Sequence, residues 1–204
     1  MYVGFIENFK RYCEIVNVMF ICGVDEVGRG PLAGEVFAAA VILPVGFSLP
    51  GLRDSKKMTE KARSRCYEVI IDQAVSWAVA SASVAEIDSL NILVAAKLAM
   101  VRAVNKLSVK PCLVNVDGNQ VIDVDYPCKA IVGGDDSNIE ISAAAVIAKV
   151  TRDRVMIALD VKCPGYYFSA NKGYGTKQHL QALKELGATQ YHRRSFAPVK
   201  KVLL

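Results

Sequence analysis

Hydrophobic and polar residues follow two different periods along this chain, and these periods predict an ordered series of strands and helices. Apolar runs, one of them alternating at every second position, predict three strands, at residues 15–27, 36–43 and 75–84. Two shorter apolar runs that end in Gly and Asp predict two further strands, within residues 112–119 and 128–138. Helical spacing predicts four helices, at residues 59–73, 91–107, 140–161 and 176–186, the last closed by Gly187. This order favours an α/β fold with a mixed sheet.

Composition limits the kinds of protein that this chain can be. With 204 residues, of which 52% are hydrophobic and 22% charged, it is expected to form one ordered domain over residues 1–204, with a helical C-terminal part from about residue 163. The longest charge-free run, residues 36–52, contains two Pro and two Gly, so no membrane span is expected. The N-terminal segment carries charges where a secretory signal would be apolar, which indicates a cytoplasmic location. We expect a monomer.

Cysteine and histidine give no framework for a zinc site or for disulfides. The six cysteines include no C-x-x-C pair, and the chain has only two histidines, His179 and His192. The formal net charge of +5 permits a polyanionic partner without requiring one. The chemistry must therefore come from other residue types.

Acidic residues follow three of the predicted strands. They are Asp25 and Glu26 after the first, Asp117 at the fourth, and Asp135 and Asp136 at the fifth. Each alone is explained by the frequency of Asp in turns. Together they would meet beyond the strand ends of an open α/β sheet, where they would repel one another unless cations lay between them. Oxygen ligands select Mg²⁺ or Mn²⁺, and two such ions about 3.5–4 Å apart can clamp the attacking and leaving oxygens in phosphodiester hydrolysis.

A glycine-rich stretch, "GRGPLAG", follows the first strand. A dinucleotide-binding loop would require a helix next, whereas Pro31 and the strand-like "EVFAAAVIL" follow here. A tight turn between strands accounts for the glycines but not for Arg29. Beside a metal cluster, exposed N–H groups and an arginine could hold the backbone and 2′-hydroxyl of a nucleic acid.

Several motifs, taken in their order along the chain, carry a resemblance to a known family. "GVDEVGRGPLAG", "DSKKMTEK", "LNILVAAKLAM", "VDGN", "GDDSNIEISAAAVIAKVTRDRVM", "NKGYGTKQHLQAL" and "HRRSFAPVK" resemble bacterial ribonuclease HII, the type 2 ribonucleases H, from about Ile21 to Val199. The resemblance implies an RNase H-like fold with a central mixed five-stranded sheet, flanking helices and a helical C-terminal part. It also implies cleavage of the RNA strand of RNA–DNA hybrids and incision beside single ribonucleotides in duplex DNA.

The same resemblance assigns the metal ligands. The family's four carboxylates fall on Asp25, Glu26, Asp117 and one of the pair Asp135 and Asp136. We choose Asp135, because a Gly precedes it directly and Glu140 follows five positions later, as in the family. Neighbouring residues of a regular strand point to opposite faces, so a strand end or a bulge is expected at Asp25 and Glu26.

Substrate contacts are also implied by the resemblance. Gly28, Arg29 and Gly30 would form the loop that recognises the ribose 2′-hydroxyl at the RNA–DNA junction, and Tyr174 would pack on the next sugar. The candidates for phosphate contacts are Lys56, Lys57, Lys149 and Arg152. Exposed basic residues on a helix are usually only solvated, and Asp153 could pair with either Lys149 or Arg152.

Four positions depart from the family pattern, at Gly133, Ala145, Asn171 and Gly175. They leave the carboxylates untouched but could alter metal affinity or junction preference. The type 3 enzymes differ by an additional N-terminal substrate-binding domain and by a glycine loop without this arginine, so type 2 is favoured.

The expected mechanism is two-metal hydrolysis that leaves a 3′-hydroxyl and a 5′-phosphate. Alternatives are another RNase H-like nuclease such as a resolvase or integrase, a non-catalytic nucleic-acid binding module, and a nucleotide-dependent enzyme. The last would need a helix after Gly34. A sliding clamp is a possible partner that the sequence does not reveal.

Overall fold

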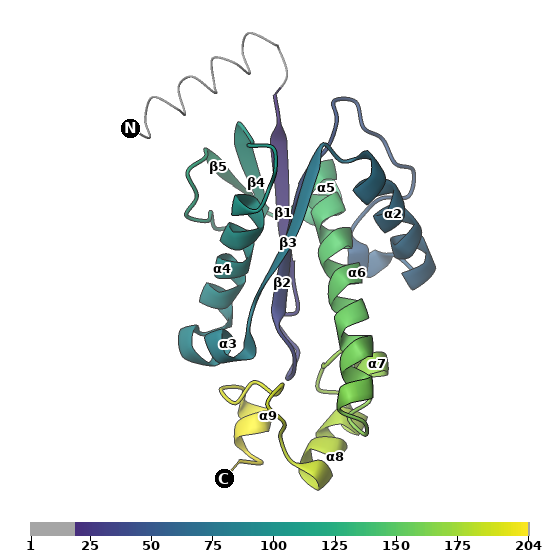
Figure 1. Ribbon diagram of the computed structural model, residues 1–204, viewed down its shortest axis with the longest axis vertical. Coiled ribbons are helices and arrows are strands. Elements are labelled where there is room, and N and C mark those ends of the chain that lie inside the picture. The colour runs from purple at the N-terminus through teal and green to yellow at the C-terminus, as the bar shows by residue number, and fades with distance from the viewer. Residues whose placement is uncertain (1–18, 204) are drawn as a thin grey trace.

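The structure, a computed structural model, describes residues 19–203. Its centre is one sheet of five strands in the order β3-β2-β1-β4-β5 (Figure 1). The strands are β1 Ile21–Val27, β2 Val36–Ile42, β3 Ser76–Ala82, β4 Leu113–Asp117 and β5 Cys128–Ile131. The pairs β1–β2 and β2–β3 are antiparallel, whereas β1–β4 and β4–β5 are parallel. The predicted mixed five-stranded sheet is therefore confirmed.

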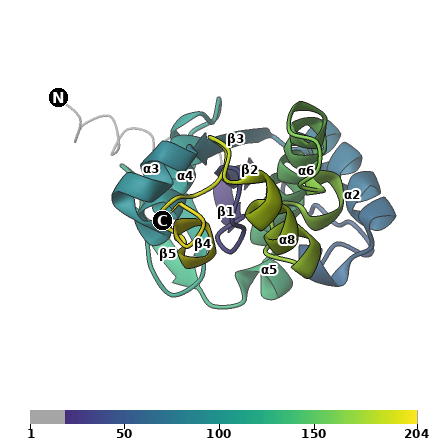
Figure 2. The same ribbon diagram turned by 90° about the horizontal axis from the view of Figure 1, so that it is seen from below.

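Helices cover both faces of this sheet. Figure 2 shows α3 (Val84–Leu90) and α4 (Ile92–Asn105) on one side of the strands, and α2 (Glu60–Gln73) and α6 (Ile139–Lys162) on the other. Each face has its own hydrophobic cluster. Every residue of β2, "VFAAAVI", is buried, because this strand lies between the two helical layers. Its three alanines allow the helices to approach closely.

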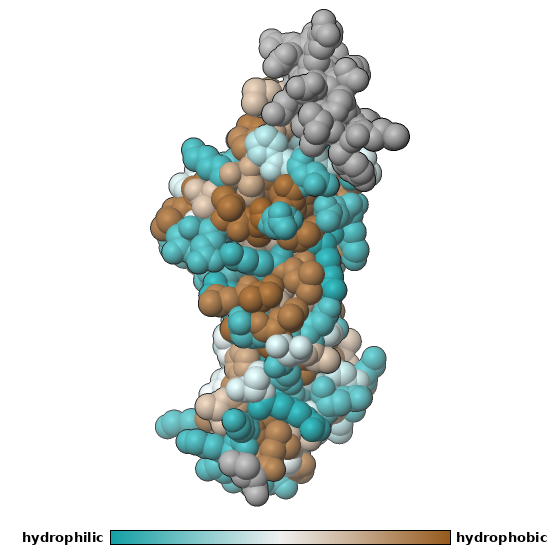
Figure 3. All heavy atoms as spheres, turned by 90° about the vertical axis from the view of Figure 1, so that its left-hand side faces the viewer, coloured by the Kyte–Doolittle hydropathy of each residue, from teal (hydrophilic) through white to brown (hydrophobic). Residues whose placement is uncertain are grey.

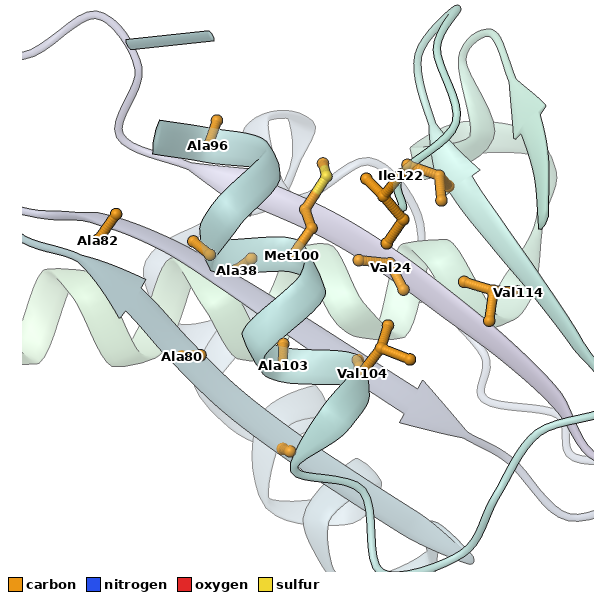
Figure 4. Packing of buried hydrophobic residues seen from close by; sticks show 14 of the residues in the cluster. Val24, Ala38, Ala80, Ala82, Ala96, Met100, Ala103, Val104, Val114 and Ile122 are labelled. Carbon is orange, nitrogen blue, oxygen red and sulfur yellow. The ribbon is translucent and has the colours of Figure 1, made fainter. Parts of the chain in front are cut away.

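The cluster beneath α4 shows how the sheet is held. Met100 and Val104 of α4 lie over Val24 of β1, Ala38 of β2 and Val114 of β4 (Figure 4). Burying an aliphatic side chain of this size contributes about 1.5–3 kcal/mol. The packing of α4 thus fixes β1 and β4, which carry acidic residues, beside each other.

The helix α3 was not predicted, and the expected strand at residues 75–84 is too long. Ser83 is the N-cap of α3, and its side chain and that of Glu86 form a capping box. This hydrogen bonding ends β3 at Ala82 and starts the helix within two residues. Asn91, with φ of 70°, then separates α3 from α4 and caps α4.

The other predictions of secondary structure differ mainly at the ends of elements. The first strand begins at Ile21, and residues 15–18 of the predicted strand lie outside the described residues. A strand begins at Val36, where the nucleotide-binding alternative requires a helix, so that alternative is wrong. The fifth strand ends at Ile131, and the acids after it belong to a short helix, α5 Gly134–Ser137.

The C-terminal part is helical, as predicted, and contains α7 Phe168–Asn171, α8 Lys177–Leu186 and α9 Ala197–Lys200. It folds back on the loop between β1 and β2, where Leu32 N donates to Gly173 O at 2.8 Å and Gly34 N donates to Tyr191 O at 2.9 Å. These bonds place the loop that follows the first acids against the C-terminal helices.

Surface hydropathy is mixed on the side formed by α3 and α4. Apolar side chains lie between hydrophilic ones there (Figure 3), and the exposed hydrophobic residues include Leu90, Leu93 and Val94. Among the described residues, no helix has both the length and the apolar character needed to cross a membrane.

Candidate active site

Two of the predicted metal ligands lie on neighbouring parallel strands. Val24 of β1 pairs with Val116 of β4, so Asp25 and Asp117 occupy equivalent next positions. Val24 and Val116 both belong to the cluster beneath α4. Because side chains alternate along a strand, Asp25 and Asp117 project from the opposite face, toward α6. The fold therefore brings these two carboxylates together from residues 92 positions apart in the numbering.

Glu26 lies on the other face of the sheet. Its strand pairs regularly with β2 through Val27, with Asp25 opposite Ala39 and Glu26 opposite Ala38. The alternative of a bulge is therefore wrong, whereas the expected strand end is confirmed, because β1 ends at Val27 and its pairing with β4 ends at Val24. Glu26 instead lines a hollow of about 280 Å³ on the side of α4, and Asp117 contributes to the same hollow. Asp117 ends β4, so it borders both faces.

The acids repel one another strongly. Burial, followed by the negative charges of Glu26 and Asp117, raises the pKa of Asp25 well above its usual range. Asp25 is only 6% exposed, and its Oδ1 accepts a bond from the Glu26 N–H at 2.7 Å. Burial and the charge of Asp117 also raise the pKa of Asp135. A positive charge at this place would lower the free energy of the folded state.

Asp135 is joined to the other acids through backbone contacts. The Oδ1 atom of Asp117 accepts bonds from the N–H groups of Gly134 at 2.8 Å and Asp135 at 3.3 Å. Lys56, on the short 3₁₀ helix η1 (Ser55–Lys57), lies 3.5 Å from the Asp135 carboxylate. This ammonium group supplies part of the positive charge that the acids require.

The side chain of Asp136 forms an ion pair with Lys57. Its carboxylate lies 2.8 Å from the Lys57 ammonium group, and both side chains are largely exposed. Lys57 lowers the pKa of Asp136 through a hydrogen bond and through its charge. Asp136 is therefore engaged with Lys57, and the choice of Asp135 as the metal ligand stays a prediction.

The donor set fits hard divalent cations. Within residues 19–203, no three acid, His or Cys side chains gather tightly enough to enclose an ion as the side chains stand. The four candidate carboxylates nevertheless border one end of β1 and β4 and offer only oxygen ligands, which suits Mg²⁺ or Mn²⁺. Burial, followed by repulsion from the neighbouring acids, raises the pKa of Asp25, and a bound cation would offset both effects.

The glycine loop lies between these acids and Tyr174. Arg29 donates from its guanidinium to Glu26 Oε1 at 3.1 Å. Gly28 has a φ of 93°, a conformation that favours glycine. A methyl group on Gly30 would lie 3.4 Å from Tyr174 Cε1, so the loop and this exposed aromatic ring are direct neighbours. The structure thus brings together the residues that the resemblance assigns to junction recognition.

All four predicted phosphate contacts have partners within the protein, and the two on η1 pair with Asp135 and Asp136 as described above. Lys149 forms an ion pair with Asp153 at 2.8 Å, one of the two pairings left open by the sequence. Arg152 is fully buried, so the prediction that it contacts a phosphate is wrong. Its guanidinium donates to backbone carbonyl oxygens of Ala33, Glu35 and Lys172. Helical spacing alone could not reveal which face of α6 is covered by the C-terminal part.

Sequence reasoning missed two residues that shape the site. Gly23 lies where α6 begins, and a methyl group there would lie 2.1 Å from the Glu140 carbonyl carbon. A glycine inside an apolar strand was the available signal. Arg193 is fully buried and binds the glycine loop. It belongs to the motif "HRRSFAPVK", but its partners are too distant in sequence to be inferred.

One departure from the family pattern has a clear structural role. Asn171 donates from Nδ2 to Tyr166 O at 2.7 Å and accepts at Oδ1 from Gly173 N at 2.7 Å. It therefore holds the turn that precedes Tyr174.

The mixed five-stranded sheet, covered by helices on both faces and bordered by carboxylates where β1 and β4 lie side by side, is that of an RNase H-like nuclease. Residues 22–199 match the ribonuclease HII family. The chain belongs to that family and is an endonuclease that hydrolyses RNA.

Known proteins similar to this chain agree with the assignment. Ribonuclease HII of Neisseria meningitidis serogroup C (strain 053442) is 57% identical over 182 residues, which are 89% of this chain and 94% of the relative. The crystal structure of ribonuclease H2 from Pyrococcus horikoshii OT3 superposes with a TM-score of 0.74 at 26% identity, covering 90% of this chain and 97% of the other. Bst-RNase HIII in complex with Mn²⁺ shares the fold, with a TM-score of 0.62 at 17% identity and coverage of 91% and 69%.

Proposed function

We propose that this enzyme hydrolyses the RNA strand of RNA–DNA hybrids and incises duplex DNA 5′ of single embedded ribonucleotides, leaving a 3′-hydroxyl and a 5′-phosphate. The proposal is supported chiefly by the contact between the acidic cluster and the glycine loop. Arg29 of the loop binds Glu26 at 3.1 Å, and Gly30 lies against Tyr174. A group that distinguishes ribose from deoxyribose would thus lie beside the groups that act on the phosphodiester.

Asp25, Glu26, Asp117 and Asp135 would hold two divalent ions, Mg²⁺ or Mn²⁺. When bound, such ions supply Lewis-acid activation of the attacking water and charge stabilisation for the leaving 3′-oxygen. The protein's part is to orient the carboxylates. Backbone N–H groups of residues 134 and 135 orient Asp117, and the Glu26 N–H orients Asp25.

The remaining residues would bind and position the nucleic acid. Lys56 and Lys57 on η1 lie beside the acids and would contact phosphates, which adds a salt-dependent share of affinity. The loop of Gly28, Arg29 and Gly30 would bind the ribose 2′-hydroxyl, and the exposed ring of Tyr174 would pack on the adjacent sugar. The expectations of a monomer in the cytoplasm and of a clamp partner stay predictions.

The test is cleavage of a labelled DNA duplex that contains one ribonucleotide, with Mg²⁺ or Mn²⁺ present. The parent protein is compared with Asp117→Asn, which keeps an oxygen to accept the bonds from residues 134 and 135. An all-DNA duplex and a long RNA–DNA hybrid serve as controls. Incision 5′ of the ribonucleotide by the parent alone supports the proposal. Cleavage of the hybrid without incision of the single-ribonucleotide duplex would remove the junction role of Arg29 and Tyr174.

A further inference from the structure

A buried arginine holds the glycine loop from inside the protein. The Arg193 guanidinium donates to four backbone carbonyl oxygens: Gly28 at 2.6 Å, Pro31 at 2.8 Å, Gly34 at 2.9 Å and Arg29 at 3.0 Å. All four acceptors belong to the loop at residues 28–34. Among the ion pairs between described residues, none includes Arg193. Its charge is therefore balanced by the dipoles of this loop.

Burial of such a group is costly. Arg193 is fully buried, and burial, followed by the charge of Arg152, lowers its pKa to about 9. The guanidinium stays charged at neutral pH. A buried cation without a carboxylate partner generally destabilises a protein. Carbonyl oxygens of the loop accept its hydrogen bonds, and the Phe196 ring lies 5.2 Å from its guanidinium carbon, so the arrangement of the loop and this side chain depend on each other.

Because of the geometry of the peptide bond, the hydrogen bonds from Arg193 to the loop carbonyl groups also set the direction of the loop N–H groups. Each peptide unit is planar and trans, so its C=O and N–H bonds point in opposite directions. Because the carbonyl groups of Gly28 and Arg29 point toward Arg193, the N–H groups of Arg29 and Gly30 point away from it. Both residues are exposed, and neither N–H finds an acceptor in the part of the chain that the structure describes.

These two N–H groups lie in the region expected to meet the nucleic acid. The Arg29 side chain reaches Glu26 on one side of the loop, and Gly30 borders Tyr174 on the other. Two successive N–H groups directed outward form a site for an electronegative oxygen. We propose that Arg193 is a positioning residue for ribonucleotide recognition, which orients the N–H groups of Arg29 and Gly30 toward the substrate by binding the carbonyl oxygens of Gly28 and Arg29. This inference rests on the proposed function.

A purely structural role for Arg193 is the competing explanation, and other contacts bear on it. The backbone of the C-terminal segment already docks on the loop without the guanidinium. Arg193 N donates to Leu32 O at 2.8 Å, Gly34 N donates to Tyr191 O at 2.9 Å, and Ala33 forms a β-bridge with His192. These contacts hold residues 32–34. At the tip of the loop, the carbonyl groups of Gly28 and Arg29 are held by the guanidinium.

The test measures discrimination between ribose and deoxyribose rather than activity. Binding is followed by fluorescence anisotropy in an Asp117→Asn background with Mg²⁺, using a DNA duplex with one ribonucleotide and the matching all-DNA duplex. The ratio of the two Kd values is the readout. Arg193→Gln removes the fork of donors, Arg193→Lys keeps the charge and part of the hydrogen bonding, and Arg194→Gln removes one charge from the exposed neighbouring side chain as a control.

We expect Arg193→Gln to reduce the preference for the ribonucleotide about tenfold, which is the effect of losing one or two hydrogen bonds to the sugar. Arg193→Lys should restore part of the preference, and Arg194→Gln should leave the ratio unchanged. An unchanged ratio in both Arg193 variants, even with a lower Tm, would overturn the inference and leave Arg193 a structural residue.

Two further outcomes are distinguishable. If the parent itself binds both duplexes equally, the proposed junction recognition fails, and the inference fails with it. If the Arg193 variants do not fold, amide NMR of the Asp117→Asn protein, which retains Arg193, tests the N–H contacts on which the inference rests. The N–H signals of Arg29 and Gly30 should shift with the ribonucleotide duplex and not with the all-DNA duplex, and equal shifts with both duplexes would overturn the inference.

Discussion

The two histidines form a buried pair that makes stability depend on pH. His179 Nε2 lies 3.1 Å from His192 Nε2. The Thr189 N–H donates to His192 Nδ1 at 3.0 Å, so the proton of His192 is on Nε2 and is donated to His179. His179 Nδ1 then donates to Tyr174 O at 2.9 Å. Both rings are neutral in this chain of bonds, because an added proton would bring two N–H groups face to face.

The magnitude follows from the pKa of His192. Burial, with a smaller effect of the neighbouring His179 ring, lowers this pKa from 6.5 to about 4. The unfolded chain therefore binds more protons than the folded protein between these two values. The neutral pair contributes its full stability above about pH 6.5 and loses it as the pH falls toward 4, a change of about 3 kcal/mol. About 2 kcal/mol of this should be lost by pH 5.

The assay is urea unfolding followed by circular dichroism at about pH 7, 6 and 5 for the parent and for His192→Asn. Asn can accept the Thr189 N–H bond but does not titrate. The variant should be less stable at pH 7 and should lose about 2 kcal/mol less than the parent on going to pH 5. Contributions from Asp25 and Asp135 occur in both proteins and cancel in the difference. Parallel pH dependences would refute the assignment of neutral, coupled rings.

Three other predictions test the site. Asp25→Asn should raise Tm in the presence of chelator, because it removes a repelling buried charge, and should reduce the stabilisation by Mg²⁺; a lower Tm in chelator would contradict the repulsion. Asp135→Asn should reduce cleavage by at least about 100-fold, since metal binding stabilises the transition state by several kcal/mol, whereas Asp136→Asn should retain activity; equal losses in a cleavage assay would contradict the assignment. Gly23→Ala should destabilise the protein by about 1–3 kcal/mol in urea unfolding, because its methyl group would meet the backbone of α6, whereas Gly30→Ala makes only an ordinary contact and should change stability little.

The sequence predicted the candidate site best where reactive residue types occur within a recognisable local motif. Acids that follow apolar runs can be placed at one end of a sheet, and a Gly directly before Asp135 distinguishes it from Asp136. Motif order along nearly the whole chain then indicates the family. The glycine loop was recognised for the same reason, since an arginine within a tight turn needs an explanation beyond the turn.

Packing between distant segments could not be predicted. The face of α6 that carries Arg152 has the spacing of an exposed basic patch, yet the C-terminal part covers it. The sequence allowed a bulge at Asp25 and Glu26, because both residues were expected to bind the same metal ions. The structure instead has regular pairing with β2, which puts Glu26 on the face opposite Asp25. The short helix α3 begins with apolar residues that continue the pattern of β3, so only its capping box marked the boundary.

The hydrogen bond between Arg193 and Gly28 O joins residues 165 positions apart. During synthesis on the ribosome, the glycine loop is therefore made well before the arginine that holds it. At about 5–20 residues per second, the arginine is added roughly 8–33 s after the glycine. All four candidate carboxylates precede it, so the nascent chain contains these acids before the glycine loop can be fastened. A chain that is shortened before Arg193 would keep the acids and lose the fastening, and under the inference drawn above it would lose its preference for ribose.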